Sequence, residues 1–88
     1  MSIPTNLEEC FAELEKQLSQ EDIEALRNED DMIMYHFSLG LWIRNNWGLW
    51  EGSPLSKHLE DRGIWHPDEM SSFILQSFHD YLNNRKVQ

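Results

Sequence analysis

The sequence predicts an all-α protein that folds as a single compact domain of about five helices over residues 1–88. Three observations favour this fold class. Apolar residues recur at intervals of three and four residues, the spacing of a helix face, and no segment alternates between apolar and polar residues as a strand would. Helix-capping residues stand before the apolar runs. A chain of 88 residues is also too short to divide its apolar side chains between two cores.

Residues 6–28 predict an acidic helical hairpin. Thr5 and a glutamate three residues later have the form of a capping box, so we expect a first helix over about residues 6–18. Ser19 is the expected cap of a short second helix that ends at about Asn28.

The negative charge of the chain is concentrated in this hairpin and in the residues just after it. Residues 1–31 hold ten acidic side chains against two basic ones, whereas residues 32–88 hold six against five, for a net charge of −9. Such a surface repels phosphate, so we expect neither nucleic-acid binding nor attachment to an anionic membrane, and a basic protein partner suits it. Six acids are candidate partner contacts: Glu21, Asp22, Glu24, Glu29, Asp30 and Asp31. As alternatives, Asn28 is the N-cap of the next helix with these acids in its first turn, or the acids form a solvated surface or bind a metal.

Residues 30–45 predict a buried central helix. From Met32 to Ile43 the side chains are apolar on nearly every side, and a helix of that kind is normally surrounded by others. Gly40 interrupts the run and leaves room for a neighbour to approach closely. His36 lies one turn earlier and is interpreted as a hydrogen-bonded interior histidine, with a ligating or catalytic role as the alternative.

The motif-bearing core of the predicted domain extends over residues 30–84. After the central helix, Ser53 and Pro54 begin a short surface helix that ends before Gly63. Pro67 then begins a last helix with two acidic residues in its first turn, where the helix dipole favours them.

The four tryptophans are expected to divide between core and surface. A domain this small cannot leave four such large apolar side chains in water, and we expect Trp42 and Trp47 in the core. Trp50 and Trp65 lie in predicted connectors, where an exposed aromatic side chain can anchor a protein partner.

Two segments resemble the signature of a known family. They are "YHFSLGLWIRNNWGLW" and "GIWHPDEMSSFILQSFHDYLN", in that order and separated by a short helix. They are similar to a small bacterial domain of unknown function with the pattern HF-x-x-G-x-x-IRN-x-WGLW followed by GI-x-HPD-x-MS-x-x-IL. The resemblance covers about residues 30–83, and the opening from Pro4 to Glu9 also fits. It implies a compact, soluble bacterial protein and assigns no catalytic residue; Trp65 and Glu69 depart from the residues usual in the pattern.

Candidate reactive side chains are few. We expect Arg44 to pair with a carboxylate, either Asp68 or an acid of residues 29–31, with contact to a substrate or partner as the alternative. Cys10 lies on the apolar stripe of the first helix and is expected to be buried and unreactive. If the two motifs converge, four residues form a candidate pocket: His36, Arg44, His66 and Asp68. No metal, phosphate-loop or nucleophile motif is present, so we expect no metal site, no cofactor and no enzyme activity.

These observations favour a non-enzymatic protein-binding module. The most concrete hypothesis is an immunity or antitoxin protein that neutralises a bacterial toxin or effector by occluding its site, with the six acids supplying charge and Trp50 and Trp65 as anchors. Two alternatives stay open: a small-molecule sensor or enzyme that uses the candidate pocket, and an accessory subunit of a larger complex. A single cysteine and the lack of a secretory leader or a bilayer-length apolar run predict a cytoplasmic protein.

Overall fold

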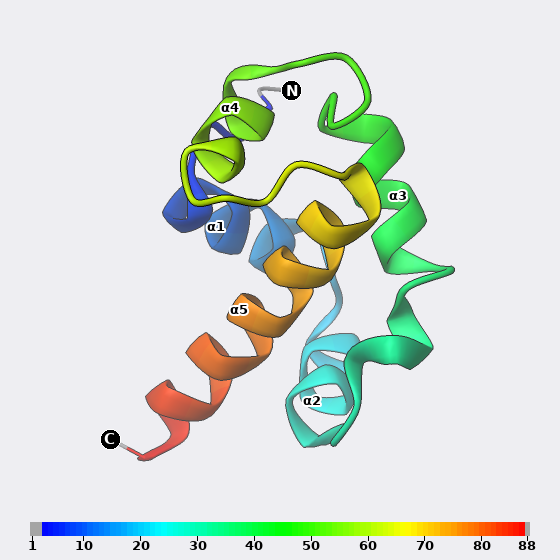
Figure 1. Cartoon of the computed structure of the whole chain (residues 1–88). Helices are drawn as coiled ribbons and strands as arrows, with labels where there is room; N and C mark the ends of the chain where they lie inside the picture. The colour runs from blue at the N-terminus through cyan, green and yellow to red at the C-terminus, as the bar shows by residue number, and fades with distance from the viewer. Residues whose placement is uncertain (1–2, 88) are drawn as a thin grey trace.

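The computed structural model describes residues 3–87, with side chains described through residue 84. Within this range the chain is all-α and forms one globule, so the predicted fold class is confirmed (Figure 1). The five α-helices and one 3-10 helix of the described range are α1 (Leu7–Gln17), α2 (Gln20–Asn28), η1 (Met32–Tyr35), α3 (Leu39–Asn46), α4 (Pro54–Glu60) and α5 (Pro67–Val87). No helix of this range is both long and apolar enough to cross a bilayer.

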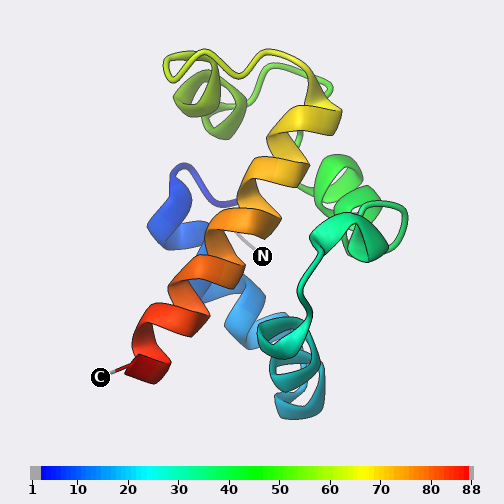
Figure 2. The same cartoon turned by 60° about the horizontal axis from the view of Figure 1, so that its bottom comes forward.

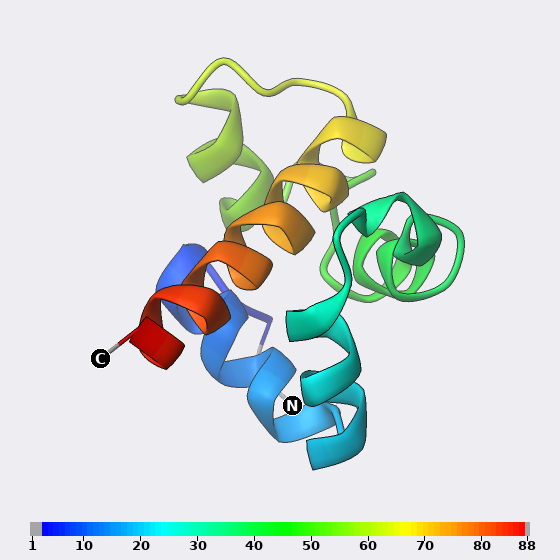
Figure 3. The same cartoon turned by 90° about the horizontal axis from the view of Figure 1, so that it is seen from below.

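The last helix occupies the centre of the fold. α5 has 21 residues and extends for about 32 Å at the usual helical rise, close to the 33 Å length of the molecule. Each of the other helices contacts it. Figures 2 and 3 show α5 crossing the molecule, with α1 passing behind it and with α2, η1 and α3 on one side of it.

The core lies where α5 meets the helices around it. Met70, Ile74 and Phe78, spaced four residues apart on one face of α5, are each at most 1% exposed. The other elements contribute a further set of buried apolar side chains: Cys10, Leu14, Leu26, Met32, Ile43, Trp47, Leu49, Leu55 and Leu59.

The expectation that Trp42 and Trp47 both lie in the core is confirmed in part, and the expectation that Cys10 is buried is confirmed in full. Trp47 is 1% exposed, whereas Trp42 is half-buried at the edge of the core and meets Trp47 edge-on with ring centroids 5.7 Å apart. Cys10 is fully buried, and this burial raises the pKa of its thiol to about 12. The thiol is therefore uncharged and shielded from reagents.

The start of α1 is shifted by one residue from the predicted capping box. Asn6, not Thr5, is the N-cap, and its side-chain oxygen accepts a 2.9 Å hydrogen bond from the Glu9 backbone N–H. The glutamate that bonds to the residues before the helix is Glu9, not Glu8. Its Oε1 accepts hydrogen bonds from the backbone N–H and the hydroxyl of Thr5, both at 2.8 Å. These bonds stabilise the carboxylate and lower the pKa of Glu9. Asparagine is as good a cap as serine and better than threonine, so it takes the position.

The other predicted helix ends are confirmed, with one correction. Ser19 and Ser53 are N-caps whose hydroxyls accept from the backbone N–H three residues on. Gly63 follows α4 with a φ of 85°, a conformation that glycine adopts without strain. Asn28, however, is the last residue of α2, and Asp31 is the N-cap of η1.

Residues 30–45 do not form the predicted buried central helix. They are divided into η1, a turn over residues 36–38, and α3. Ile33, Met34 and Phe37 face solvent, with exposed fractions of 66%, 68% and 80%. The prediction is wrong because α5 fills the centre of the domain, and residues 30–45 lie along one side of it.

Hydrogen bonds at the turn explain where this helix breaks. The N–H groups of His36 and Ser38 donate to carbonyls three residues back, which is the tighter pattern of a 3-10 helix. The carbonyl of His36 would accept from residue 40 in a continuous α-helix, but here it accepts from Arg44 Nη2 at 3.2 Å. Ser38 has φ −111° and ψ −86°, outside the helical region, and α3 begins after it.

Candidate functional site

Arg44, near the end of α3, joins three parts of the chain. Its side chain is 5% exposed, Nη1 donates to Ser71 Oγ at 2.7 Å, and Nε lies 3.4 Å from Asp68 Oδ1. The predicted ion pair with Asp68 is therefore confirmed. Together with the bond to the His36 carbonyl, these contacts connect the turn after η1 to the first turns of α5. A buried guanidinium needs such partners, because an unpaired charge in the core is strongly destabilising.

Gly40 leaves the space that this guanidinium occupies. A Cβ atom at position 40 would lie 3.2 Å from Arg44 Nη1 and 3.2 Å from the Tyr35 carbonyl oxygen. Both distances are shorter than ordinary van der Waals contact, so a side chain here would press on the arginine or on the backbone of η1. The close approach expected at Gly40 is thus confirmed, and the neighbour is the arginine one turn later.

His66 and Asp68 lie together at the start of α5. His66 Nδ1 accepts a 3.0 Å hydrogen bond from the Asp68 backbone N–H, so the imidazole acts as the side-chain cap of this helix. Asp68 is half-exposed, and its Oδ2 lies 4.0 Å from the same nitrogen. The Trp50 ring meets the imidazole edge-on, with ring centroids 6.0 Å apart. Sequence reasoning missed this cap, because histidine is an uncommon residue for that task.

The structure brings the four residues of the candidate pocket close together through contacts that centre on Arg44 and Asp68. Arg44 bridges Asp68 and the backbone of His36, and His66 adjoins Asp68. The His36 side chain points elsewhere: its Nδ1 lies 3.4 Å from the Ser72 hydroxyl, at a groove that the other three residues do not line.

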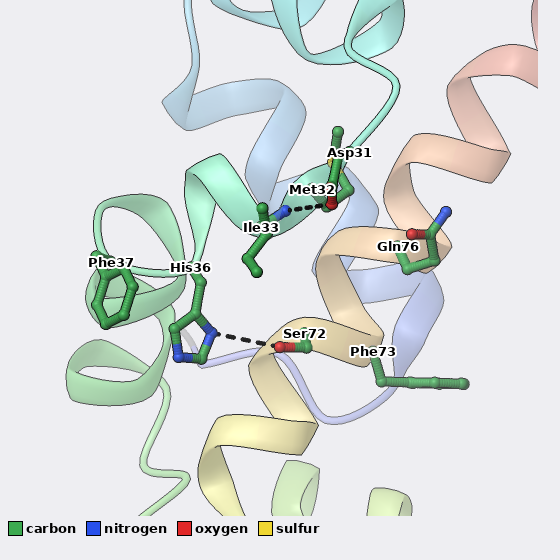
Figure 4. Close-up of a pocket in the computed structure, with 8 residues that line it drawn as sticks. All are labelled: Asp31, Met32, Ile33, His36, Phe37, Ser72, Phe73 and Gln76. Carbon is green, nitrogen blue, oxygen red and sulfur yellow. Dashed lines mark hydrogen bonds between the residues drawn. The ribbon is translucent and has the colours of Figure 1, made fainter.

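This groove, between η1 and α5, has a volume of about 540 Å³ (Figure 4). Figure 4 shows His36 pointing toward Ser72 and Ile33 extending into the space between η1 and α5. Four of the lining residues are apolar, and one carries a carboxylate. They are Asp31, Met32, Ile33, His36, Phe37, Ser72, Phe73 and Gln76.

Sequence reasoning missed Ile33 and Phe37 as surface residues. The apolar run from Met32 to Ile43 does not by itself separate exposed from buried positions, because burial depends on which side chains α5 covers.

The six predicted acidic contacts gather on α2 and on the connector to η1, a region that we name the acidic end: Glu21, Asp22, Glu24, Glu29, Asp30 and Asp31. Two of them have structural partners, since Glu24 pairs with Arg27 and Asp31 accepts from the Ile33 N–H at 3.0 Å. The side chains of Glu21, Asp22 and Asp30 are exposed. Some carboxylates of the acidic end therefore have partners within the domain, and the others form a solvent-facing charged surface.

The predicted aromatic anchors lie at the other end of the molecule. Trp50 is 56% exposed and Trp65 is 69% exposed, and both belong to connectors that flank α4. In Figures 1 and 2 these connectors and α2 lie at opposite ends. The predicted charges and the predicted anchors therefore do not share one face.

One comparison with known proteins identifies a family. The model of a domain of unknown function, DUF6794, matches residues 3–82. No curated protein and no solved structure matches the chain. Since the match covers nearly the whole sequence, the chain belongs to the DUF6794 family.

Proposed function

We propose that this chain is a non-enzymatic protein-binding module that covers a basic partner protein, in the manner of an immunity or antitoxin protein that occludes a toxin. The observation that carries the proposal is the exposure of Ile33, Met34 and Phe37, each at least 66% accessible, beside a core that is filled without them. Large apolar side chains grouped on a small soluble domain are typical of a protein-interaction surface.

The position of the charge supports a basic partner. The acidic end leads directly into η1, so the exposed carboxylates of Glu21, Asp22 and Asp30 lie on elements adjacent in the chain to the exposed apolar side chains. An apolar centre with charged residues around it is the usual composition of a protein interface. The acids attract a cationic partner over a distance, and the apolar side chains hold it after contact.

The arrangement of the polar residues favours binding over catalysis. Arg44 is enclosed and bonded to protein groups, and His66 Nδ1 is occupied by a backbone N–H. These groups hold the fold together in the described structure. The candidate pocket therefore supports a sensor or enzyme less well than the exposed apolar surface supports a protein partner.

The proposal is tested by capturing partners from a lysate of the source organism with tagged protein, at low and at high salt. We expect one stoichiometric basic protein that is retained at low salt and released at high salt, since screening weakens attraction between exposed charges. Addition of the chain to that purified partner should then abolish the partner's activity. Capture that does not change with salt, or a captured partner whose activity is unaffected, would contradict the proposal.

A pair of charge-reversal variants locates the charge that matters. Glu21→Lys with Asp30→Lys reverses two exposed carboxylates of the acidic end, and Glu51→Lys with Asp61→Lys makes the same change in net charge at the other end of the molecule. The first pair should weaken capture strongly and the second only slightly. Equal effects would show that net charge, and not this surface, governs binding.

A further inference from the structure

We infer that the groove between η1 and α5 is the docking site for a basic amphipathic helix of the partner, with its apolar side chains in the groove and its cations toward the acidic end. This inference rests on the proposed function and names the partner's chemistry. It is carried by the position of an apolar groove beside the carboxylates of Asp30 and Asp31, a proximity that the sequence analysis did not predict.

The groove has the size and lining to accept apolar side chains. Its volume of about 540 Å³ lies within the range of roughly 300–1,000 Å³ that is usual for ligand sites. Its lining residues on α5 extend from Ser72 to Gln76, about one helical turn, so it holds one or two bulky side chains and not a long segment. Ile33 and Phe37, four residues apart, form the opposing wall and are largely exposed.

The charge around the groove selects a cation. Asp31 is a lining residue, Asp30 precedes it and is exposed, and the eight lining residues include no lysine or arginine. A partner lysine or arginine beside an apolar anchor would therefore meet a carboxylate. Lipid head groups that are anionic and phosphate backbones would be repelled at the same place.

The same charges disfavour a second copy of this chain as the occupant. Two copies that pair through the groove would bring their Asp30 and Asp31 carboxylates together, and each copy carries a net charge of −9. Like charges that meet at an interface repel each other and oppose such a pair. A strand is disfavoured as well, since the described residues contain no sheet edge to extend, and an apolar groove on a helical protein normally receives a helix.

The test uses fluorescence anisotropy with three labelled synthetic peptides of equal length. The first is an amphipathic helix with leucines at positions i, i+3, i+4 and i+7 and lysines on its flanks; the second is the same peptide scrambled; the third has glutamates in place of the lysines. We expect binding by the first, with affinity at least about tenfold higher than that of the other two.

Three variants place the binding in the groove. Phe37→Ala removes a side chain that is 80% exposed and should weaken the first peptide about tenfold, whereas Trp65→Ala removes a side chain that is 69% exposed at the other end and should leave binding unchanged. Asp31→Asn removes the charge and keeps a side-chain oxygen that can still cap η1. It should weaken binding of the lysine peptide and reduce its dependence on salt.

The outcomes separate this inference from the proposed function. Equal binding of all three peptides, no binding of any, or binding that Phe37→Ala does not weaken would overturn the groove assignment. If the captured partner nevertheless binds Phe37→Ala as it binds the unmodified chain, the proposed function stands and its contact surface lies elsewhere. If no partner is captured and neutralised, the proposed function fails whatever the peptides do.

Discussion

The two halves of the apolar segment between residues 32 and 50 differ in their surroundings. Most large apolar side chains of the first half are exposed, although Met32 is buried, whereas most of those in the second half are buried or half-buried, although Leu41 and Trp50 are exposed. In the second half, Ile43, Trp47 and Leu49 are at most 3% exposed, whereas in the first half Ile33 and Phe37 are 66% and 80% exposed. Apolar composition alone therefore does not determine burial. What separates the halves is the turn over residues 36–38, which directs the chain after it against α5 and leaves much of η1 outside.

The sharpest way to break this comparison is to remove one aromatic side chain from each half. Trp47→Ala should lower the free energy of unfolding by about 3–5 kcal/mol, because it leaves a large cavity in the core. Phe37→Ala should change it by less than about 0.5 kcal/mol, because the ring is mostly in water. Urea denaturation followed by circular dichroism measures both. Similar costs for the two variants would mean that the halves do not differ as described.

The next largest effect is expected at Arg44, whose hydrogen bonds connect the turn after η1 to α5. Arg44→Met should lower the free energy of unfolding by about 3 kcal/mol, because Ser71 and the His36 carbonyl lose a charged donor. Asp68→Asn should cost less than about 1 kcal/mol, since the Asp68 carboxylate is half-exposed and solvent screens the pair. A larger loss from Asp68→Asn than from Arg44→Met would show that the ion pair, and not the guanidinium's bonds to Ser71 and to the backbone, supplies most of the stabilisation.

A pH titration tests the buried part of the molecule through Cys10. The unfolded thiol releases its proton near pH 9, whereas the folded thiol keeps it to about 12, so the unfolded state binds fewer protons between these values. Stability from this group is therefore complete below about pH 9 and falls as the pH rises. We expect a loss of about 1.4 kcal/mol between about pH 8 and about pH 10.

Cys10→Ala supplies the control for this titration. The variant is expected to start less stable, but its loss between the same two pH values should be smaller than that of the unmodified chain by the contribution of the thiol. Identical alkaline losses in the two proteins would show that the Cys10 thiol has the same pKa folded and unfolded.

A smaller effect than the loss at Arg44 is expected at Gly40. Gly→Ala in a helix normally stabilises by up to about 1 kcal/mol, but here the new Cβ would lie 3.2 Å from Arg44 Nη1 and from the Tyr35 carbonyl. We expect Gly40→Ala to destabilise by about 1 kcal/mol. The cost should shrink when Arg44→Met is already present, and thermal unfolding of the single and double variants measures that coupling. Stabilisation by Gly40→Ala would contradict the packing described for Arg44.

Much of the fold could be predicted from local signals. Ser19, Ser53 and Gly63 act at short range, so their effect on helix ends is readable from the sequence alone. The ion pair of Arg44 with Asp68 was one of two pairings that the sequence left open, since an arginine just after an apolar helix is expected to pair with a carboxylate.

The remaining features depend on contacts between distant parts of the chain. The break at residues 36–38 depends on the bond between Arg44 and the His36 carbonyl, and burial depends on which surface α5 covers. For the same reason the sequence placed the acids and the exposed tryptophans in one interface, although they lie at opposite ends. The groove brings Ile33 next to residues about forty positions later in the chain, a proximity with no local signal.

The central claim is that the exposed half of the apolar segment binds and the buried half folds. The most direct measurement is a methyl NMR titration of chain labelled at isoleucine and methionine with the lysine-flanked amphipathic peptide. We expect the methyl signals of Ile33 and Met34 to shift, while those of Ile43 and Ile74 in the core stay in place. Shifts confined to residues away from η1, or shifts spread through the core, would contradict this claim.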